Sequence, residues 1–172
     1  AAPSTLECID RVQRRFLRAM SMTDEDALLN FRLAPLETRR DISILGMLHR
    51  VNLGLVSPQM QELFPRVGVR PVDRRSVASR VRSARSYHDR QLLDRVSATS
   101  TVQFRLSIFG MVQCYNALPQ SIVNASSVKA FQRSLQLKLI DRVRGGYDDW
   151  QQIFTIGRRY ASILRFQAFF HG

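Results

Sequence analysis

The residues of this chain that are best suited to chemistry are its arginines. The sequence holds 26 Lys and Arg against 14 Asp and Glu, a formal net charge of +12, and its lysines are Lys129 and Lys138. Arginine is a planar fork of five donors that suits phosphate and guanine edges, and a large charge of one sign attracts polyanions or an anionic membrane surface. Drift of GC-rich coding DNA toward arginine explains part of the Arg/Lys ratio, but it explains the net charge less well. Because no segment approaches the roughly 18–20 apolar residues of a membrane helix, we expect RNA or DNA as the partner and no membrane.

Four of these arginines share one side of a predicted helix near the start of the chain. A helix over residues 4–20 places Arg11, Arg14, Arg15 and Arg18 within an arc of about 100°. The opposite side collects the apolar residues, which we expect to be buried: Leu6, Ile9, Val12, Phe16, Leu17 and Met20. Such a line of positive charge can follow a row of phosphates, and an ordinary solvated helix face is the alternative.

A second concentration of arginine lies between residues 66 and 100. That segment holds nine arginines and three aspartates, a net charge of +6, with little apolar periodicity. We interpret it as a long loop with a helical turn near Asp89 to Val96. It is either a mobile solvated linker or a nucleic-acid contact that orders on binding. Beyond the first helix, the candidate nucleic-acid-binding residues are Arg39, Arg40, Arg74, Arg75, Arg80, Arg82 and Arg85.

One short motif invites comparison with a metal-dependent active site. Asp148 and Asp149 follow Tyr147 as the paired aspartates of a polymerase do, but two-metal chemistry needs a further carboxylate on a neighbouring strand. The nearest upstream acid, Asp141, belongs to the preceding helix, so we interpret the pair as the N-terminal acids of a helix before Trp150. No nucleophile elbow, phosphate-binding glycine loop or His/Cys metal spacing is present in the sequence. We therefore expect no catalytic residue, metal ligand or cofactor on this chain.

The elements that position these residues are predicted to be helices. Capping residues and apolar spacing indicate a short helix after Thr23, a longer one from Pro35 to Val51, and a short one opened by Ser57 and Pro58. The longer helix is expected to end near Gly54 and to bury Leu36, Ile44, Met47, Leu48 and Val51.

The second half of the chain shows similar patterns. Alternating apolar residues from Val102 to Ile108 are typical of a short strand that leads into a helix ending at Pro119. A further helix is capped by Ser126 and Ser127 and is ended by Gly145 and Gly146. Its buried face is expected to carry Val128, Phe131, Leu135 and Leu139. The apolar tail, residues 150–170, either docks as a last helix or forms a seam toward another domain.

Together these patterns predict a mainly α fold. We expect an irregular helical bundle with a long Arg-rich loop and at most one short strand or hairpin. Its parts are an N-terminal helical half over residues 1–65, the Arg-rich loop or linker over 66–100, and a C-terminal helical half over 101–172.

Three blocks of the sequence carry a resemblance to a known family. They are IDRVQRRFLRAM from Ile9 to Met20, FRLAPLETRRDISILGMLHRVNLG from Phe31 to Gly54, and YNALPQSIVNASSVKAFQRSLQ from Tyr115 to Gln136. In this order they resemble the region that follows the palm in non-LTR (LINE-type, jockey-like) retrotransposon reverse transcriptases. In the last block Ser127, Phe131 and Leu135 occupy the family's Ser, Phe and Leu positions, whereas Tyr115 stands where the family usually has Trp.

The resemblance implies the helical thumb and post-thumb part of an RNA-directed DNA polymerase, the part that grips the template–primer duplex. The palm, with its catalytic aspartates and Mg²⁺, would be a partner outside this chain. By this analogy Arg11, Arg14, Arg15 and Arg18 are candidates for backbone contacts, in the nucleus or in a cytoplasmic ribonucleoprotein. The alternatives are a helical protein-interaction domain that uses the apolar tail as its surface, and a decayed element copy with no present function.

Overall fold

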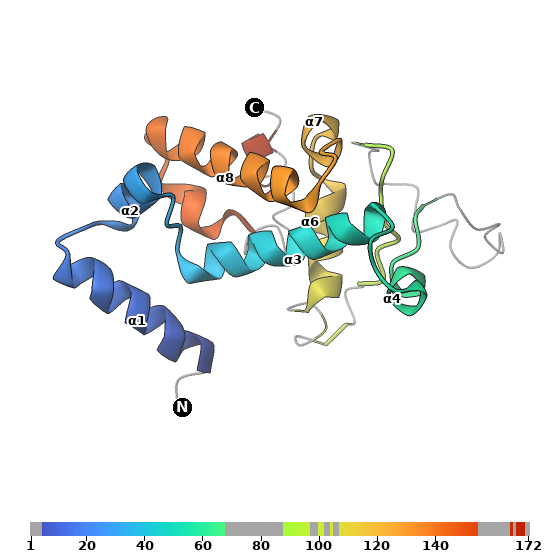
Figure 1. Ribbon diagram of the computed structural model, residues 1–172, viewed down its shortest axis with the longest axis horizontal. Helices are drawn as coiled ribbons and strands as arrows, with labels where there is room; N and C mark the ends of the chain where they lie inside the picture. Colours follow the sequence, from blue (N-terminus) through green and yellow to red (C-terminus); the bar gives the residue numbers. More distant parts are fainter. Residues whose placement is uncertain are drawn as a thin grey trace.

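The computed structural model describes residues 5–67, 88–96, 100–101, 104, 107–154, 166 and 168–170. These residues form a mainly α-helical, irregular bundle, as the sequence predicts (Figure 1). Its elements are α1 (Thr5–Ala19), α2 (Asp24–Phe31), α3 (Leu36–Asn52), α4 (Pro58–Leu63), η2 (Ile108–Met111), α6 (Val112–Asn116), α7 (Gln120–Val123), α8 (Val128–Arg144) and η3 (Asp148–Gln152). Over the described ranges, β pairing is limited to an isolated antiparallel bridge between Arg66 and Leu92.

Three helices begin at the residues that the sequence marks as caps. The Thr23 hydroxyl accepts the backbone N–H of Asp26, whose carboxylate accepts the Thr23 N–H, so the two residues form a capping box at the start of α2. Ser57 and Ser127 cap α4 and α8 by accepting the backbone N–H three residues on. Just beyond α3, Gly54 adopts a φ of 72°, which suits a glycine at a helix end. These predicted helix starts and the predicted stop are confirmed.

The centre of the fold is the packing of α3 against α8, which lie side by side (Figure 1). The ring of His49 on α3 stacks on Phe131 of α8, with centroids 4.3 Å apart. A Cβ at Gly46 would lie 2.5 Å from Nε2 of Gln132, so the absence of a side chain at Gly46 makes room for the Gln132 side chain of α8. The other apolar residues that this pair buries are Ile42, Leu45, Leu48 and Val51 on α3, and Leu135, Leu139, Ile140 and Val143 on α8.

The predicted buried face of α3 is partly wrong. Leu48 and Val51 are buried as predicted, but Leu36 and Ile44 are half-buried and Met47 is 40% exposed. The face turned toward α8 is the neighbouring one, where a glycine and a histidine interrupt the apolar spacing on which the prediction relied. On α8 three of the four predicted residues are fully buried, and Val128 is half-buried.

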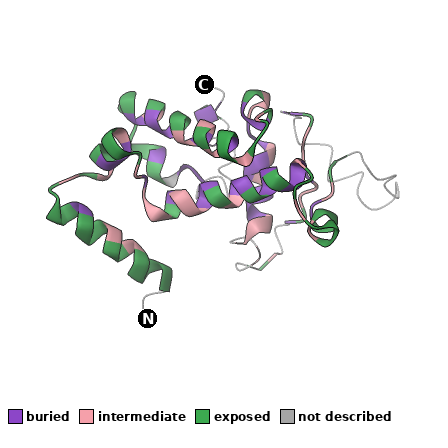
Figure 2. Cartoon of the chain, viewed as in Figure 1, coloured by how far each residue is buried: buried purple, intermediate pink, exposed green. Residues whose placement is uncertain are grey.

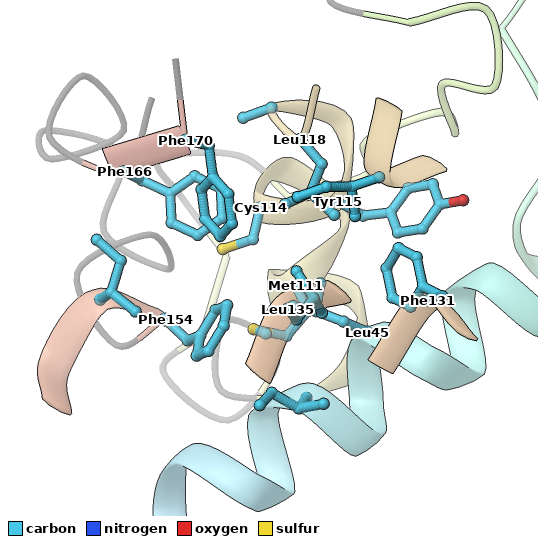
Figure 3. Packing of buried hydrophobic residues seen from close by; sticks show 14 of the residues in the cluster. Leu45, Met111, Cys114, Tyr115, Leu118, Phe131, Leu135, Phe154, Phe166 and Phe170 are labelled. Atoms are coloured by element: carbon cyan, nitrogen blue, oxygen red, sulfur yellow. The ribbon is translucent and has the colours of Figure 1, made fainter. Parts of the chain in front are cut away.

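The described part of the apolar tail docks on the core. Phe166 and Phe170 lie beside Cys114 of α6, and their ring centroids are 4.9 Å apart (Figure 3). The buried tail residues are Trp150, Ile153, Phe154, Phe166, Phe169 and Phe170, each at most 8% exposed. These side chains are therefore covered by the protein itself and are not open to a partner. The tail residues Ile163 and Leu164 lie outside the described residues, as does most of the predicted strand, whose last residue, Ile108, begins η2.

The described ends of the Arg-rich segment also pack on the body of the protein. His88, Leu92 and Val96 are buried, and the side chain of Asn116 bonds both the N–H and the C=O of Leu92, at 2.8 and 2.7 Å. The predicted helical turn near Asp89 to Val96 is wrong. The chain there makes a turn and then an extended bridge, because its backbone groups bond to distant partners rather than to the next turn of a helix.

The first helix departs most from expectation. Figure 2 shows α1 almost entirely exposed, and Leu17 is the one residue of α1 that is buried. The predicted apolar face is otherwise open to solvent: Leu6 is 51% exposed, Ile9 46%, Val12 67%, Phe16 55% and Met20 57%. The expectation that this face is buried is therefore wrong, for a tertiary reason, since α1 contacts α3 along one edge of the helix.

Candidate nucleic-acid interface

The four arginines of α1 form an open line of positive charge. Arg11, Arg14, Arg15 and Arg18 are all exposed, and none of them makes a hydrogen bond or ion pair with another described residue. We call these four residues the arginine stripe. Arg11 and Arg18 are about 10 Å apart along the axis at the 1.5 Å rise of an α-helix. Successive phosphates of one strand rise by about 3.4 Å along the duplex axis, so a stripe laid parallel to that axis spans about three of them.

A polar clamp holds α1 against α3 and fixes the direction of the stripe. Both carboxylate oxygens of Asp10 accept hydrogen bonds from the Arg40 guanidinium, at 2.8 and 2.9 Å. Gln13 donates to the backbone carbonyl of Ala34 at 3.2 Å and accepts from Arg39 at 3.3 Å. Asp10 lies between the charged and apolar sides of α1, and Gln13 lies at the edge of the apolar side that faces α3, so most of both sides remains exposed.

The ionic part of the clamp is partly shielded from solvent. The side chains of Arg40 and Asp10 are 32% and 21% exposed. Hydrogen bonds from Arg40 hold the pKa of Asp10 below its ordinary value, and the charges of Arg40 and Arg14 lower it further. The pair therefore stays ionised at neutral pH, and Arg14 is the stripe residue whose charge acts on it.

The clamp engages two of the candidate residues. Arg39 and Arg40 lie on α3 as predicted, and their guanidinium groups donate hydrogen bonds to Gln13 and Asp10 of α1. Both side chains are partly exposed. These two arginines hold α1 against α3, and they stay candidates for contact with nucleic acid.

The candidates in the loop fall outside the structural description. Arg74, Arg75, Arg80, Arg82 and Arg85 lie outside the described residues, so they stay predictions. The described arginines that flank them are structural: Arg66 donates to the carbonyl of Asn52, Arg90 to that of Val123 and Arg95 to that of Glu62.

Sequence reasoning missed a second basic surface, on α8. Lys129 and Arg133 are exposed one turn apart near the start of that helix, and Arg144 is exposed at its end. Lys138 is exposed at another edge of the same helix. Their helical spacing is visible in the sequence, but they are sparser than the arginine clusters of residues 11–18 and 66–95. Figure 1 shows α8 and α1 on opposite sides of α3, so the two basic surfaces do not form one continuous line.

The paired aspartates near the end of the chain have a structural role. Asp148 and Asp149 lie in the first turn of η3, as the interpretation of N-terminal acids predicts. Asp149 accepts two hydrogen bonds of 3.2 Å from Arg142, whose guanidinium lies 3.6 Å from the ring centroid of Tyr147. The described residues contain no cluster of three or more His, Cys, Asp or Glu that could hold a metal ion.

Two buried histidines are engaged in the core rather than in a site. Nε2 of His49 lies 3.0 Å from the carbonyl of Ala125, and its Nδ1 lies 3.1 Å from the Tyr115 hydroxyl. Nε2 of His88 lies 3.0 Å from the carbonyl of Tyr115, and its Nδ1 accepts the N–H of Arg90. Because carbonyls only accept, both imidazoles carry their proton on Nε2. Burial lowers the pKa of each, so both are neutral at physiological pH.

The helices described are too short or too polar for any of them to cross a bilayer. No protein-family model matches the chain, and no curated protein or solved structure is significantly similar to it.

Proposed function

We propose that this chain is a non-catalytic nucleic-acid-binding element that holds a phosphate backbone along the arginine stripe of α1. The observation that carries the proposal is the set of four exposed arginines that make no hydrogen bond or ion pair with another described residue, on a helix whose direction a polar clamp fixes. Basic residues in such a line bind phosphates without reading the bases.

The sequence blocks that resemble LINE-type reverse transcriptases supply the context for this role. In that context the chain is the C-terminal portion of an RNA-directed DNA polymerase and holds the template–primer duplex while chemistry occurs on a separate palm. RNA–DNA hybrid is then the preferred ligand. The net charge of +12 adds a general attraction to any polyanion, which the experiment must separate from binding at the stripe.

Two variants with the same loss of charge distinguish binding at the stripe from the general attraction of a basic protein to polyanions. The first changes Arg11, Arg14, Arg15 and Arg18 to Gln, which keeps a similar helix propensity. The control changes the four basic residues of α8 to Gln: Lys129, Arg133, Lys138 and Arg144.

Affinity for RNA–DNA hybrid, duplex DNA and single strands is measured at one low salt concentration. We expect the stripe variant to lose at least ten-fold in affinity for the hybrid, and the α8 variant to lose about three-fold or less. Equal losses in the two variants would show that net charge, and not the stripe, determines binding.

A further inference from the structure

The apolar side of α1 is an exposed surface that the proposed function does not use. Leu6, Ile9, Val12, Phe16 and Met20 are between 46% and 67% exposed, and at helical spacing they fall within an arc of about 120°. We call these five residues the apolar stripe. A phosphate backbone is contacted by basic and hydrogen-bonding groups, so nucleic-acid binding does not account for the apolar stripe.

The charged and apolar sides of α1 are separated more sharply than those of α2, α3 or α8. The centre of the arginine stripe lies about 170° around the helix from the centre of the apolar stripe. Eight of the 15 residues of α1 are polar or charged, so the helix is two-sided without being hydrophobic overall. A helix with arginine on one side and Leu, Ile and Phe on the other, and with low overall hydrophobicity, is typical of one that lies in the plane of a membrane interface.

The rest of the protein leaves this side of α1 accessible. The helix lies at the edge of the molecule with most of its surface exposed (Figure 2). Asp10 and Gln13 hold it to α3, and together with the buried Leu17 they mark one side of the helix. Val12 and Phe16 lie about 100–140° around the helix from Leu17 and are 67% and 55% exposed. A flat surface can therefore reach the open part of the apolar stripe while the clamp stays in place.

The arginine stripe stays close to the headgroups when α1 lies in this way. An interfacial helix buries its apolar side by about 5–10 Å, and a helix with its side chains is about 10–12 Å across. The far side of α1 is then less than about 8 Å above the surface, which is one Debye length at physiological ionic strength. Arg15, about 60° around the helix from Val12, is the arginine nearest to the bilayer.

The charge of α1 suits an anionic lipid surface. The four arginines outnumber the acids of the helix, which are Glu7 and Asp10, and Asp10 is already paired with Arg40. Basic residues near the surface of an anionic leaflet are attracted to its headgroups. The membrane partner therefore has to carry negative charge as well as an acyl region.

A bilayer differs from a protein partner in two respects that match this surface. Its anionic headgroups compensate the net charge of +12, whereas a second copy of the chain would double that charge. Its acyl region accepts a single narrow apolar face, whereas a stable protein interface buries about 800 Å² on each partner.

This mode of binding does not require a spanning segment. The expectation that a membrane is not a partner rests on the absence of such a segment from the sequence. A helix that lies in the plane of the interface needs neither the length nor the unbroken apolar sequence of a spanning helix.

We infer that α1 is an interfacial helix that binds an anionic phospholipid surface, with the apolar stripe in the acyl boundary and the arginines at the level of the headgroups. Lipid and nucleic acid both draw on the arginine stripe, but the apolar stripe serves lipid alone. Substitutions in the apolar stripe therefore distinguish this inference from the proposed function.

The first experiment measures binding of the full 172-residue chain to sedimentable vesicles. The vesicles are phosphatidylcholine alone, or phosphatidylcholine with about one third phosphatidylserine. The variant Ile9→Ser with Phe16→Ser removes apolar area from the stripe at similar helix propensity. The matched control is Leu55→Ser with Leu137→Ser, two residues that are exposed elsewhere.

We expect the chain to bind the phosphatidylserine vesicles at least ten-fold more tightly than phosphatidylcholine alone. The Ile9/Phe16 variant should lose at least ten-fold in that affinity and the Leu55/Leu137 variant less than two-fold, while both keep wild-type circular dichroism. Part of the wild-type binding should remain at high salt, because burial of apolar side chains is not screened. Affinity for RNA–DNA hybrid should not change in the Ile9/Phe16 variant, so the two proposals fail separately.

The second experiment tests whether the apolar stripe enters the acyl region. Phe16→Trp places a fluorescent reporter in the stripe of a chain whose native Trp150 is only 1% exposed. Leu137→Trp, on the outer side of α8, is the control. Acyl chains that carry bromine quench tryptophan on contact. We expect anionic vesicles of brominated lipid to quench Phe16→Trp strongly, and Leu137→Trp no more than the wild-type chain.

Four outcomes would overturn the inference. The first is that the chain does not bind the phosphatidylserine vesicles. The second is binding that high salt abolishes and that Ile9→Ser with Phe16→Ser leaves unchanged, which would mean charge attraction alone. The third is equal quenching of Phe16→Trp and Leu137→Trp, which would mean that α1 does not enter the bilayer. The fourth is a concentration-dependent dimer that the Ile9/Phe16 variant abolishes, which would assign the apolar stripe to a second copy.

Discussion

Asp10 and Arg40 lie on different helices and form the bidentate pair that joins α1 to α3. Exposed ion pairs contribute about 0.2–1 kcal/mol to stability, and this pair is only partly shielded. The larger effect of the pair is to fix the direction of α1 relative to α3, because α1 has few other contacts with the rest of the protein. Arg40 stays a candidate for nucleic-acid binding, and its contact with Asp10 adds a role in positioning the stripe.

Reversing the charge of Asp10 distinguishes the effect of the position of α1 on binding from the effect of net charge. Asp10→Arg raises the net charge by two, which on charge alone would strengthen binding to nucleic acid. We expect it instead to lower affinity for RNA–DNA hybrid about three-fold, because it repels Arg40 and frees α1 from its fixed direction. The double variant Asp10→Arg with Arg40→Asp restores the pair and should restore affinity. Tighter binding by Asp10→Arg alone would show that the clamp has no role in binding.

The buried histidines make stability depend on pH. Burial holds the pKa of His49 and of His88 below the value of 6.5 that each recovers on unfolding, and the charge of Arg90 lowers both further. Asp89 opposes this effect at His88. Below pH 6.5 the unfolded chain therefore binds more protons than the folded one, so the free energy of unfolding falls as the pH falls.

Urea unfolding at pH 7.5, 6.5 and 5.0 tests this. We expect a loss of at most about 1.4 kcal/mol per pH unit for each histidine below pH 6.5, and little change between pH 7.5 and 6.5. The lowered carboxyl pKa values, such as that of Asp10, act only at more acidic pH. His49→Gln should reduce the loss by about half. A free energy of unfolding that stays constant down to pH 5.0 would contradict the neutral, buried state of both rings.

At the scale of elements, local signals predicted the helices well. A cap is a contact between residues three apart, so Thr23, Ser57 and Ser127 could be identified without knowledge of the fold. The buried face of α3 could not be identified in this way, because it depends on which helix packs against α3. Gly46 and His49 break the apolar spacing, yet they lie against α8. The open apolar stripe of α1 has the same explanation, since helical periodicity shows that a face is apolar and not what covers it.

Two substitutions on α3 compare the observed face with the predicted one. Leu45 is fully buried, whereas Met47, which the spacing placed inside, is 40% exposed. We expect Leu45→Ala to lower the free energy of unfolding by about 2–5 kcal/mol, and Met47→Ala by about 0.5 kcal/mol or less. Chemical denaturation of both variants measures the difference. Equal losses would mean that the buried face of α3 is not the one that carries Leu45.

At the scale of the whole molecule, the protein is a packed body with one helix held at its edge. The body joins α3, α8, α6 and the aromatic tail in a single core, so the N-terminal and C-terminal helical halves share their buried residues. α1 remains outside that core and offers a charged side and an apolar side to partners (Figure 2).

The candidate site could be predicted from the sequence only in part. The four arginines of α1 were identified from their spacing, because a shared side of a helix is a local property. That Arg39 and Arg40 hold α1, and that Arg66, Arg90 and Arg95 bond backbone carbonyls, depends on tertiary contacts that charge counts do not reveal.

The salt dependence of binding tests the central claim most directly. Each phosphate contact adds about 0.9 to the magnitude of the slope of log affinity against log salt on duplex nucleic acid. Contacts to about three phosphates along the stripe therefore predict that the stripe variant, Arg11, Arg14, Arg15 and Arg18 to Gln, lowers that slope by about 2–3 on RNA–DNA hybrid. The α8 variant of equal charge should leave the slope within about 1 of wild type. If both variants reduce the slope equally, or neither does, the arginine stripe is not the surface that holds the phosphate backbone.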